Sequence, residues 1–138
     1  LARDGGTGGQ GDGGTGGQEQ LSDLSQDAYL IYTSGSTGKP KGTRLHHLGL
    51  ANLAAWQQEA FALTPSDRVL QFAPLSFDAA IWELVMALAS GATLVLADPA
   101  ELADPVQLHA LLRREGVTIA TLPPAMLNLL RPDGLPDL

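Results

Sequence analysis

A loop rich in glycine, hydroxyl residues and lysine is the part of the sequence best suited to chemistry. It reads YTSGSTGKPKG from Tyr32 to Gly42 and directly follows an apolar stretch, residues 28–31. Glycines let successive backbone N–H groups turn towards one anion, and nearby hydroxyl and ammonium groups strengthen such a site. The whole chain has a formal net charge of −7, so lysines gathered here favour a local anionic ligand. We predict polyphosphate binding by Thr33, Ser34, Gly35, Ser36, Thr37, Gly38, Lys39 and Lys41.

This loop does not match other phosphate or nucleophile motifs. A Walker loop requires a second glycine five residues after the first, but Pro40 occupies that position counted from Gly35. The sequence also has no protein-kinase glycine loop and no G-x-S-x-G elbow. On composition alone, the structural alternative is an ordinary polar loop with solvent-facing lysines.

Composition excludes several other classes of function. The chain has no cysteine, and His46, His47 and His109 lack a ligand spacing, so no metal site is expected. No run approaches the ~18 apolar residues of a membrane span, and the N-terminus lacks the apolar core of a signal peptide. The excess of acidic residues argues against nucleic acid as a partner. We expect a soluble cytoplasmic protein that binds neither membrane nor nucleic acid.

Strand and helix patterns alternate after residue 27 and would position the loop at the end of the first strand. Strands are expected at residues 28–33, 43–46, 68–73, 92–97 and 117–122. Helices are expected at residues 48–61, at residues 78–90 and after Asp104, with one more short helical stretch near the C-terminus. Strands separated by helices predict an α/β fold, a partial, mainly parallel sheet with covering helices. Such sheets bind ligands at the carboxyl ends of their strands.

Residues 1–27 differ from the rest and are expected to form a disordered, glycine-rich linker. They hold nine of the sixteen glycines, five acids and a single basic residue, Arg3. Gly6, Gly8 and Gly11 match a G-x-G-x-x-G spacing, but no apolar strand precedes them, so a dinucleotide site is not expected. We therefore divide the chain into a low-complexity linker, residues 1–27, and a partial domain, residues 28–138.

The string YTSGSTGKPKG resembles, nearly letter for letter, the signature loop of the adenylate-forming, or AMP-binding, superfamily. Its members include acyl-CoA synthetases, luciferases and the adenylation domains of nonribosomal peptide synthetases. The resemblance implies that Thr33 to Gly38 bind the β- and γ-phosphates of ATP, with Lys39 and Lys41 nearby. It begins at Asp27 and implies that the segment is an internal part of the large N-terminal subdomain of such an enzyme.

A second segment, FDAAIWEL at residues 77–84, favours the amino-acid-activating branch of the superfamily. It is similar to the segment that supplies an aspartate to the α-ammonium group of the substrate, which implies that Asp78, Ala79 and Trp82 line the amino-acid pocket. Asp78 is expected at a helix start, where the helix dipole keeps a carboxylate ionised. The structural alternatives are a plain N-cap for Asp78 and core packing for Trp82.

The resemblance also implies roles for other residues, each with a structural alternative. The segment TLPPAML resembles a strand end that contributes a pocket residue, which maps to Thr121; a buried strand threonine bonded to backbone fits equally well. His47 follows the loop as in many relatives, with packing or capping as its alternative. Ala80 replaces a common serine, so a hydroxyl at the helix start is lost. The pocket residues favour an α-amino acid with an apolar or aromatic side chain, and the remaining apolar residues of this helix, Ile81, Leu84, Val85 and Leu88, are expected in the core.

The resemblance implies a reaction for the parent enzyme but none for this chain alone. The parent would use ATP and Mg²⁺ to convert an amino acid into aminoacyl-AMP and pyrophosphate. It would then pass the aminoacyl group to the phosphopantetheine thiol of a carrier domain, beside condensation domains. The family's magnesium-associated glutamate, ribose-binding aspartate and catalytic lysine lie outside this chain, so we expect it to be inactive by itself. The alternatives are a fragment of an acyl- or aryl-CoA ligase and a non-catalytic remnant.

Overall fold

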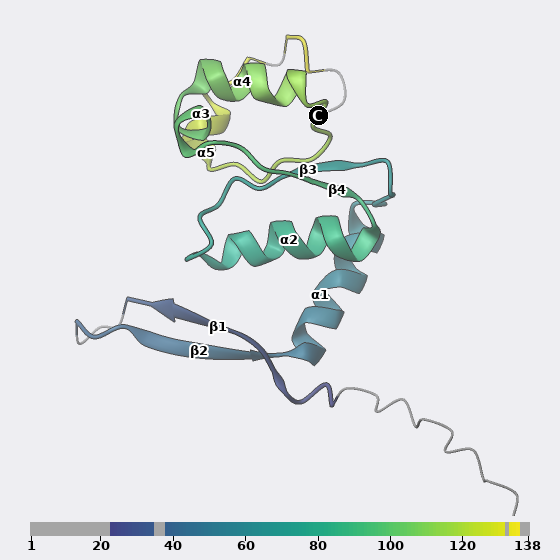
Figure 1. Ribbon diagram of the computed structural model, residues 1–138, viewed down its shortest axis with the longest axis vertical. Coiled ribbons are helices and arrows are strands. Elements are labelled where there is room, and N and C mark those ends of the chain that lie inside the picture. Colours follow the sequence, from purple (N-terminus) through teal and green to yellow (C-terminus); the bar gives the residue numbers. More distant parts are fainter. Residues whose placement is uncertain (1–22, 35–37, 132, 136–138) are drawn as a thin grey trace, which may run out of the picture.

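The structure is a computed structural model that describes residues 23–34, 38–131 and 133–135 of the chain. Its elements form successive layers (Figure 1): a β-hairpin, the helix α2 (Asp78–Ser90), a small parallel sheet, and the helix α4 (Pro105–Arg114) with the C-terminal segment. The helix α1 (His47–Ala60) runs from the hairpin to the end of α2. The expected linker, residues 1–27, falls almost entirely outside the described residues.

The first two strands form an antiparallel hairpin. β1 (Asp27–Thr33) pairs with β2 (Lys41–His46), and Thr33 lies opposite Lys41. The expectation of a mainly parallel sheet is wrong here, because a parallel crossover needs roughly a dozen residues and only residues 34–40 separate these strands. Although the first strand is apolar in sequence, Leu30 is 51% exposed and Tyr32 is 63% exposed.

The second sheet is parallel, as expected, and shorter than the sequence pattern suggests. β3 (Arg68–Leu70) pairs with β4 (Thr93–Val95), and α2 (Asp78–Ser90) is the crossover between them. The strand expected at residues 117–122 is reduced to a single parallel bridge between Val69 and Ile119. The described residues therefore have an α/β fold with two small sheets, one antiparallel and one parallel.

Local sequence signals mark the C-terminal end of α2 and the start of α4. α1 spans His47–Ala60 and α2 ends at Gly91, whose φ of 73° is readily adopted only by glycine. Asp104 caps the helix that follows it by accepting hydrogen bonds from the Val106 and Gln107 N–H groups, at 2.8 and 3.3 Å. The helices after β4 are α3 (Pro99–Ala103), which was not expected, α4 (Pro105–Arg114) and α5 (Pro124–Leu127).

Two apolar clusters lie on opposite faces of the parallel sheet. Because successive strand residues point to opposite faces, Leu70 packs towards α4 while Val69 packs towards α2. The α4 cluster is built from Leu70, Val95, Leu108, Leu111, Leu112 and Val117. The α2 cluster contains Leu63, Val69, Met86 and Ala87. Leu88 was expected in the core but is 66% exposed.

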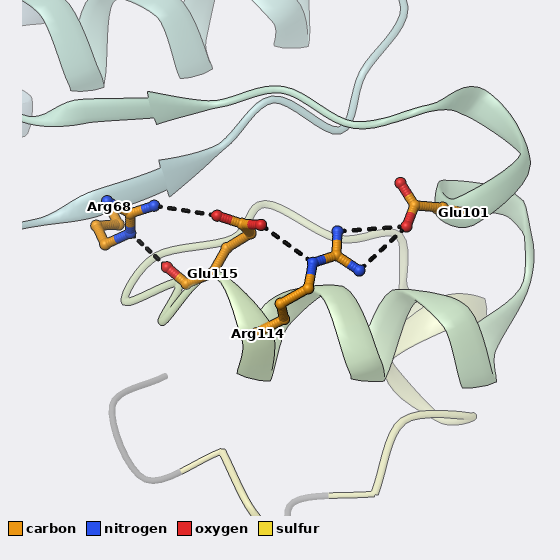
Figure 2. Close-up of polar contacts among 4 residues, drawn as sticks. All are labelled: Arg68, Glu101, Arg114 and Glu115. Carbon is orange, nitrogen blue, oxygen red and sulfur yellow. Dashed lines mark hydrogen bonds and ion pairs between the residues drawn. The ribbon is translucent and has the colours of Figure 1, made fainter.

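A chain of ion pairs joins β3 to α3 and α4 (Figure 2). Glu115 accepts contacts from Arg68 at 3.3 Å and from Arg114 at 3.1 Å, and Arg114 also lies 3.3 Å from Glu101. The Arg68 guanidinium donates in addition to the Glu115 carbonyl. These groups are partly exposed, so each pair contributes little stability and their main effect is to fix the geometry of the α4 end.

Candidate functional site

The end of β1 and the start of α2 line a hollow of about 480 Å³. Thr33 and Ser34 lie on one side, and Ser76, Phe77 and Asp78 lie on the other. Thr33 and Ser34 begin the predicted polyphosphate loop, so the hollow adjoins it. The structure thus brings the start of that loop next to the first residues of α2.

A second hollow, of about 370 Å³, contains the four residues predicted to bind the amino acid. Asp78, Ala79, Trp82 and Thr121 all line it. They come from the first two turns of α2 and from the segment before α5, 39 or more positions apart in sequence. Tyr29 and Leu53 complete the lining from β1 and α1. Asp78 lines both hollows, so one carboxylate lies between the two predicted ligand sites.

Asp78 is the first residue of α2 and is exposed to solvent. Its Oδ1 accepts a hydrogen bond from the Ala79 N–H at 2.9 Å. The N-cap position itself belongs to Phe77, so the plain N-cap interpretation of Asp78 does not describe this geometry. The Asp78 carboxylate can pair with a cation that enters the hollow.

The Asp78 carboxylate acts on Tyr29, which faces the same hollow. Burial raises the pKa of the Tyr29 phenol above its ordinary value of 10.0, and the negative charge of Asp78 raises this pKa further. Both effects disfavour the phenolate. Tyr29 therefore stays a neutral hydroxyl group at physiological pH, able to donate or accept a hydrogen bond beside Asp78.

Trp82 lines the hollow and also packs in an aromatic cluster. Its ring centroid lies 5.7 Å from that of Trp56 and 6.0 Å from that of Phe61. Within the part of the chain that the structure describes, the buried Trp82 indole N–H has no hydrogen-bond partner. Both interpretations of Trp82, core packing and pocket wall, therefore fit its position.

Thr121 is exposed and lies outside every strand, so the alternative of a buried strand threonine is not what the structure has. Three of the predicted loop residues, Gly35, Ser36 and Thr37, lie outside the described residues. Gly38 has a φ of 77°, a left-handed conformation that favours glycine. Lys39 and Lys41 are exposed, and among the described residues neither forms an ion pair.

Arg44 and His47, which lie near the loop in sequence, make contacts within the fold. Arg44 is a basic residue two positions beyond the loop, and it binds the Asp27 carboxylate across the hairpin. His47 begins α1, and its backbone N–H donates to the Gln26 carbonyl at 3.0 Å. The loop's positive charge therefore comes from its two lysines.

The described residues do not form a magnesium site. Among them, no group of three or more His, Cys, Asp or Glu side chains could hold a metal ion. Mg²⁺ prefers several oxygen ligands around one point, and Asp78 alone does not supply them. No helix in the described part of the chain is long and apolar enough to cross a membrane.

Several residues at this site were missed by the sequence motifs. Tyr29 and Leu53 line the amino-acid hollow, and Ser76 and Phe77 line the neighbouring one. Their positions depend on how the hairpin and α1 fold against α2, which no local pattern reveals. Glu83 was quoted within FDAAIWEL but given no role, although a lone acid in the apolar run of α2 is a signal that could have found it.

A family model described as AMP-binding enzyme matches residues 6–137. The chain belongs to this family. The match begins upstream of Asp27, where the resemblance read from the motifs begins. Within the family, the chain is a fragment of a nonribosomal peptide synthetase adenylation domain: it is 45% identical over 119 residues to tyrocidine synthase 1 of Brevibacillus parabrevis. That alignment covers 86% of this chain and 11% of the synthase.

Solved structures of adenylating proteins have the same fold. The AMPPNP-bound form of the nonribosomal peptide synthetase FmoA3 matches with a TM-score of 0.70 and 40% identity, over 77% of this chain and 11% of that one. The Vibrio cholerae adenylation domain AlmE, in complex with glycyl-adenosine-5'-phosphate, matches with a TM-score of 0.71 and 28% identity. This second match covers 79% of this chain and 20% of AlmE.

Proposed function

We propose that residues 27–131 supply the phosphate loop and one wall of the amino-acid pocket in an ATP-dependent adenylation reaction. In this reaction an amino-acid carboxylate attacks the α-phosphate of ATP, forming aminoacyl-AMP and releasing pyrophosphate. Residues Thr33 to Gly38, Lys39 and Lys41 bind the phosphates. Asp78 binds the substrate ammonium group, and Ala79, Trp82 and Thr121 line the pocket.

One observation carries this proposal: Asp78 lines both hollows, between the start of the phosphate loop and the residues of the predicted pocket. An amino acid bound with its ammonium group at Asp78 would lie close to a nucleotide whose phosphates occupy the neighbouring hollow. Holding two reactants together in this way removes much of the entropic barrier to a bimolecular reaction. The proximity of the hollows therefore fits a reaction between an amino acid and ATP.

The pocket favours an α-amino acid with an apolar or aromatic side chain. Leu53, Trp82 and the ring of Tyr29 offer apolar surface, while Asp78 is the one ionisable acid in its described lining. Magnesium would be held by the nucleotide and by groups beyond the described residues, because these residues do not form a site for it. Transfer to the phosphopantetheine of a carrier domain, next to condensation domains, is part of the same proposal.

The test is a hybrid of tyrocidine synthase 1 in which residues 27–131 of this chain replace the matching segment. We expect amino-acid-dependent ATP–pyrophosphate exchange, measured over the twenty proteinogenic amino acids. Asp78→Ala removes a charged hydrogen bond of roughly 1.5 to 3 kcal/mol, so the KM for the amino acid should rise by about tenfold to a hundredfold.

A matched control is Asp98→Ala, which removes another aspartate at a helix N-terminus. Asp98 caps α3 by accepting from the Ala100 N–H at 2.8 Å and lines neither hollow. It should leave the KM for the amino acid unchanged. Exchange driven by fatty or aryl acids, and insensitive to Asp78→Ala, would contradict the proposal and favour a ligase that does not bind amines.

A further inference from the structure

Glu83 is a fully buried carboxylate that the proposed function does not use. Its side chain is 0% exposed, although it lies on α2 among apolar residues. Its Oε2 accepts hydrogen bonds from the Phe72 N–H and the Ala73 N–H, both at 3.0 Å, and its Oε1 lies 3.3 Å from the Ala73 nitrogen. Burial raises the pKa of Glu83, while these backbone donors act in the opposite direction.

The two amides that Glu83 binds lie just past the end of the parallel sheet. The last sheet-like hydrogen bond on this strand runs from the Gln71 N–H to the Val95 carbonyl, at 2.9 Å. Among the described residues, no neighbouring strand lies beside the next two N–H groups, and a buried N–H without an acceptor is costly. Glu83 supplies the acceptor from the helix that follows.

This contact closes a loop whose far end is Asp78. After Ala73 the backbone turns, with a hydrogen bond of 2.9 Å from the Phe77 N–H to the Pro74 carbonyl, and then enters α2. Asp78 begins that helix and Glu83 follows five residues later. The Glu83 side chain therefore ties Phe72 and Ala73, where the loop begins, to α2, where the loop ends at Asp78. A shift of the start of α2 relative to Phe72 and Ala73 would break these hydrogen bonds.

Packing alone does not explain a carboxylate at this position. Burying a charge costs several kcal/mol even when it is paired, and an apolar side chain would fill the same space without that cost. Two backbone N–H donors point at this side chain. A carboxylate only accepts hydrogen bonds and can satisfy both donors. The position thus favours a role in fixing the loop over a role in the core.

We infer that Glu83 is a positioning residue: by binding the Phe72 and Ala73 amides it holds the loop at residues 72–78, and hence Asp78, between the two hollows. This inference rests on the proposed function for its consequence in catalysis. Its geometric part concerns this chain alone and can be tested without any reaction.

The first test measures backbone amides in the full 138-residue chain by NMR. Glu83→Gln leaves a single acceptor oxygen and introduces an NH₂ group where two N–H groups point. We expect hydrogen exchange at Phe72 and Ala73 to become roughly tenfold to a hundredfold faster. The Ala79 amide, which donates to Asp78, should change its chemical shift because the loop and the carboxylate move together.

The control is Met86→Ala, another fully buried position on the same helix. It lowers stability through lost packing but leaves the loop contacts in place, so the Ala79 shift should be unchanged. Unchanged exchange at Phe72 and Ala73 in Glu83→Gln, or an equal Ala79 shift in Met86→Ala, would overturn the inference. Should Glu83→Gln not fold, Glu83→Asp decides, because it keeps the charge but shortens the side chain: unchanged amides in this variant would overturn the inference too.

The second test uses the tyrocidine synthase hybrid described above. Glu83→Gln should raise the KM for the amino acid by about tenfold, while Met86→Ala, compared at an equal loss of Tm, should not. An unchanged KM in Glu83→Gln, in a hybrid where Asp78→Ala raises it, would overturn the role of Glu83. A hybrid that activates no amino acid would instead contradict the proposed function, and the amide measurements would still decide whether Glu83 positions Asp78.

Discussion

At the residue scale, the site depends on the Asp78 carboxylate and on the groups that contact it. Asp78 is held by the Ala79 N–H, lies at a helix N-terminus and faces the phenol of Tyr29. Asp78 supplies the acidic group of the hollow, and the raised pKa of Tyr29 keeps the phenol neutral. The hollow therefore offers one full negative charge to an incoming ammonium group.

Replacing Asp78 by Asn should lower the pKa of Tyr29. The carboxylate raises that pKa because phenolate formation would place two negative charges close together, and Asn removes this repulsion while burial remains. The titration can be followed by NMR of tyrosine labelled at Cζ. A Tyr29 titration that is identical in Asp78→Asn and the unchanged protein would show that the two groups do not face each other.

At the element scale, helix ends decide where the site residues lie. α2 starts at Asp78 and ends at Gly91, and its length sets the span from the site to β4. Glu83 binds the loop before α2. Gly91, in a left-handed conformation, caps the other end of the helix. Local signals for helix boundaries are therefore also signals for the geometry of the pocket.

Two glycine substitutions should change stability in opposite directions. Gly91→Ala forces an alanine into φ 73° and should lower the free energy of unfolding by about 1 to 2 kcal/mol, although the added Cβ meets only Pro65 at 3.7 Å. Gly49→Ala lies inside α1 with nothing within 4 Å, so it should raise that free energy by about 0.5 to 1 kcal/mol. Urea denaturation measures both. Equal shifts of the same sign would contradict the assigned helix boundaries.

At the scale of the whole molecule, the site is open. Asp78 and Thr121 are exposed, and large apolar residues such as Leu75 and Phe77, which are 72% and 61% exposed, lie close to it in the chain. Water screens charges in such a hollow, so its electrostatic interactions are weaker than in a closed pocket. The chain also spans only 11% of tyrocidine synthase 1.

We therefore expect residues 1–138 alone to show no ATP–pyrophosphate exchange with any amino acid, whereas the hybrid is active. Both proteins should be measured in the same assay at equal concentration. A reaction of each protein without amino acid serves as the control for background exchange. Robust exchange by the 138-residue chain would show that an open site is sufficient and would refute this expectation.

The sequence by itself determined the family, most element positions and the main ligand-binding candidates. The loop YTSGSTGKPKG and the segment FDAAIWEL are continuous in sequence, so their chemistry is readable without a fold. Helix caps at Asp104 and Gly91 are likewise local, because each depends on hydrogen bonds or dihedral angles within a few residues. These features could be predicted since nearby residues alone create them.

The tertiary structure decided which segments meet. It made the first two strands an exposed antiparallel hairpin, reduced residues 117–122 to one bridge, and brought Tyr29 and Thr121 to the same hollow as Asp78. It also buried Glu83 against amides ten and eleven residues away. These outcomes depend on how elements distant in sequence pack together. The whole fold decides which groups are buried and hydrogen-bonded, and the local sequence of one segment does not identify the segment that it will contact.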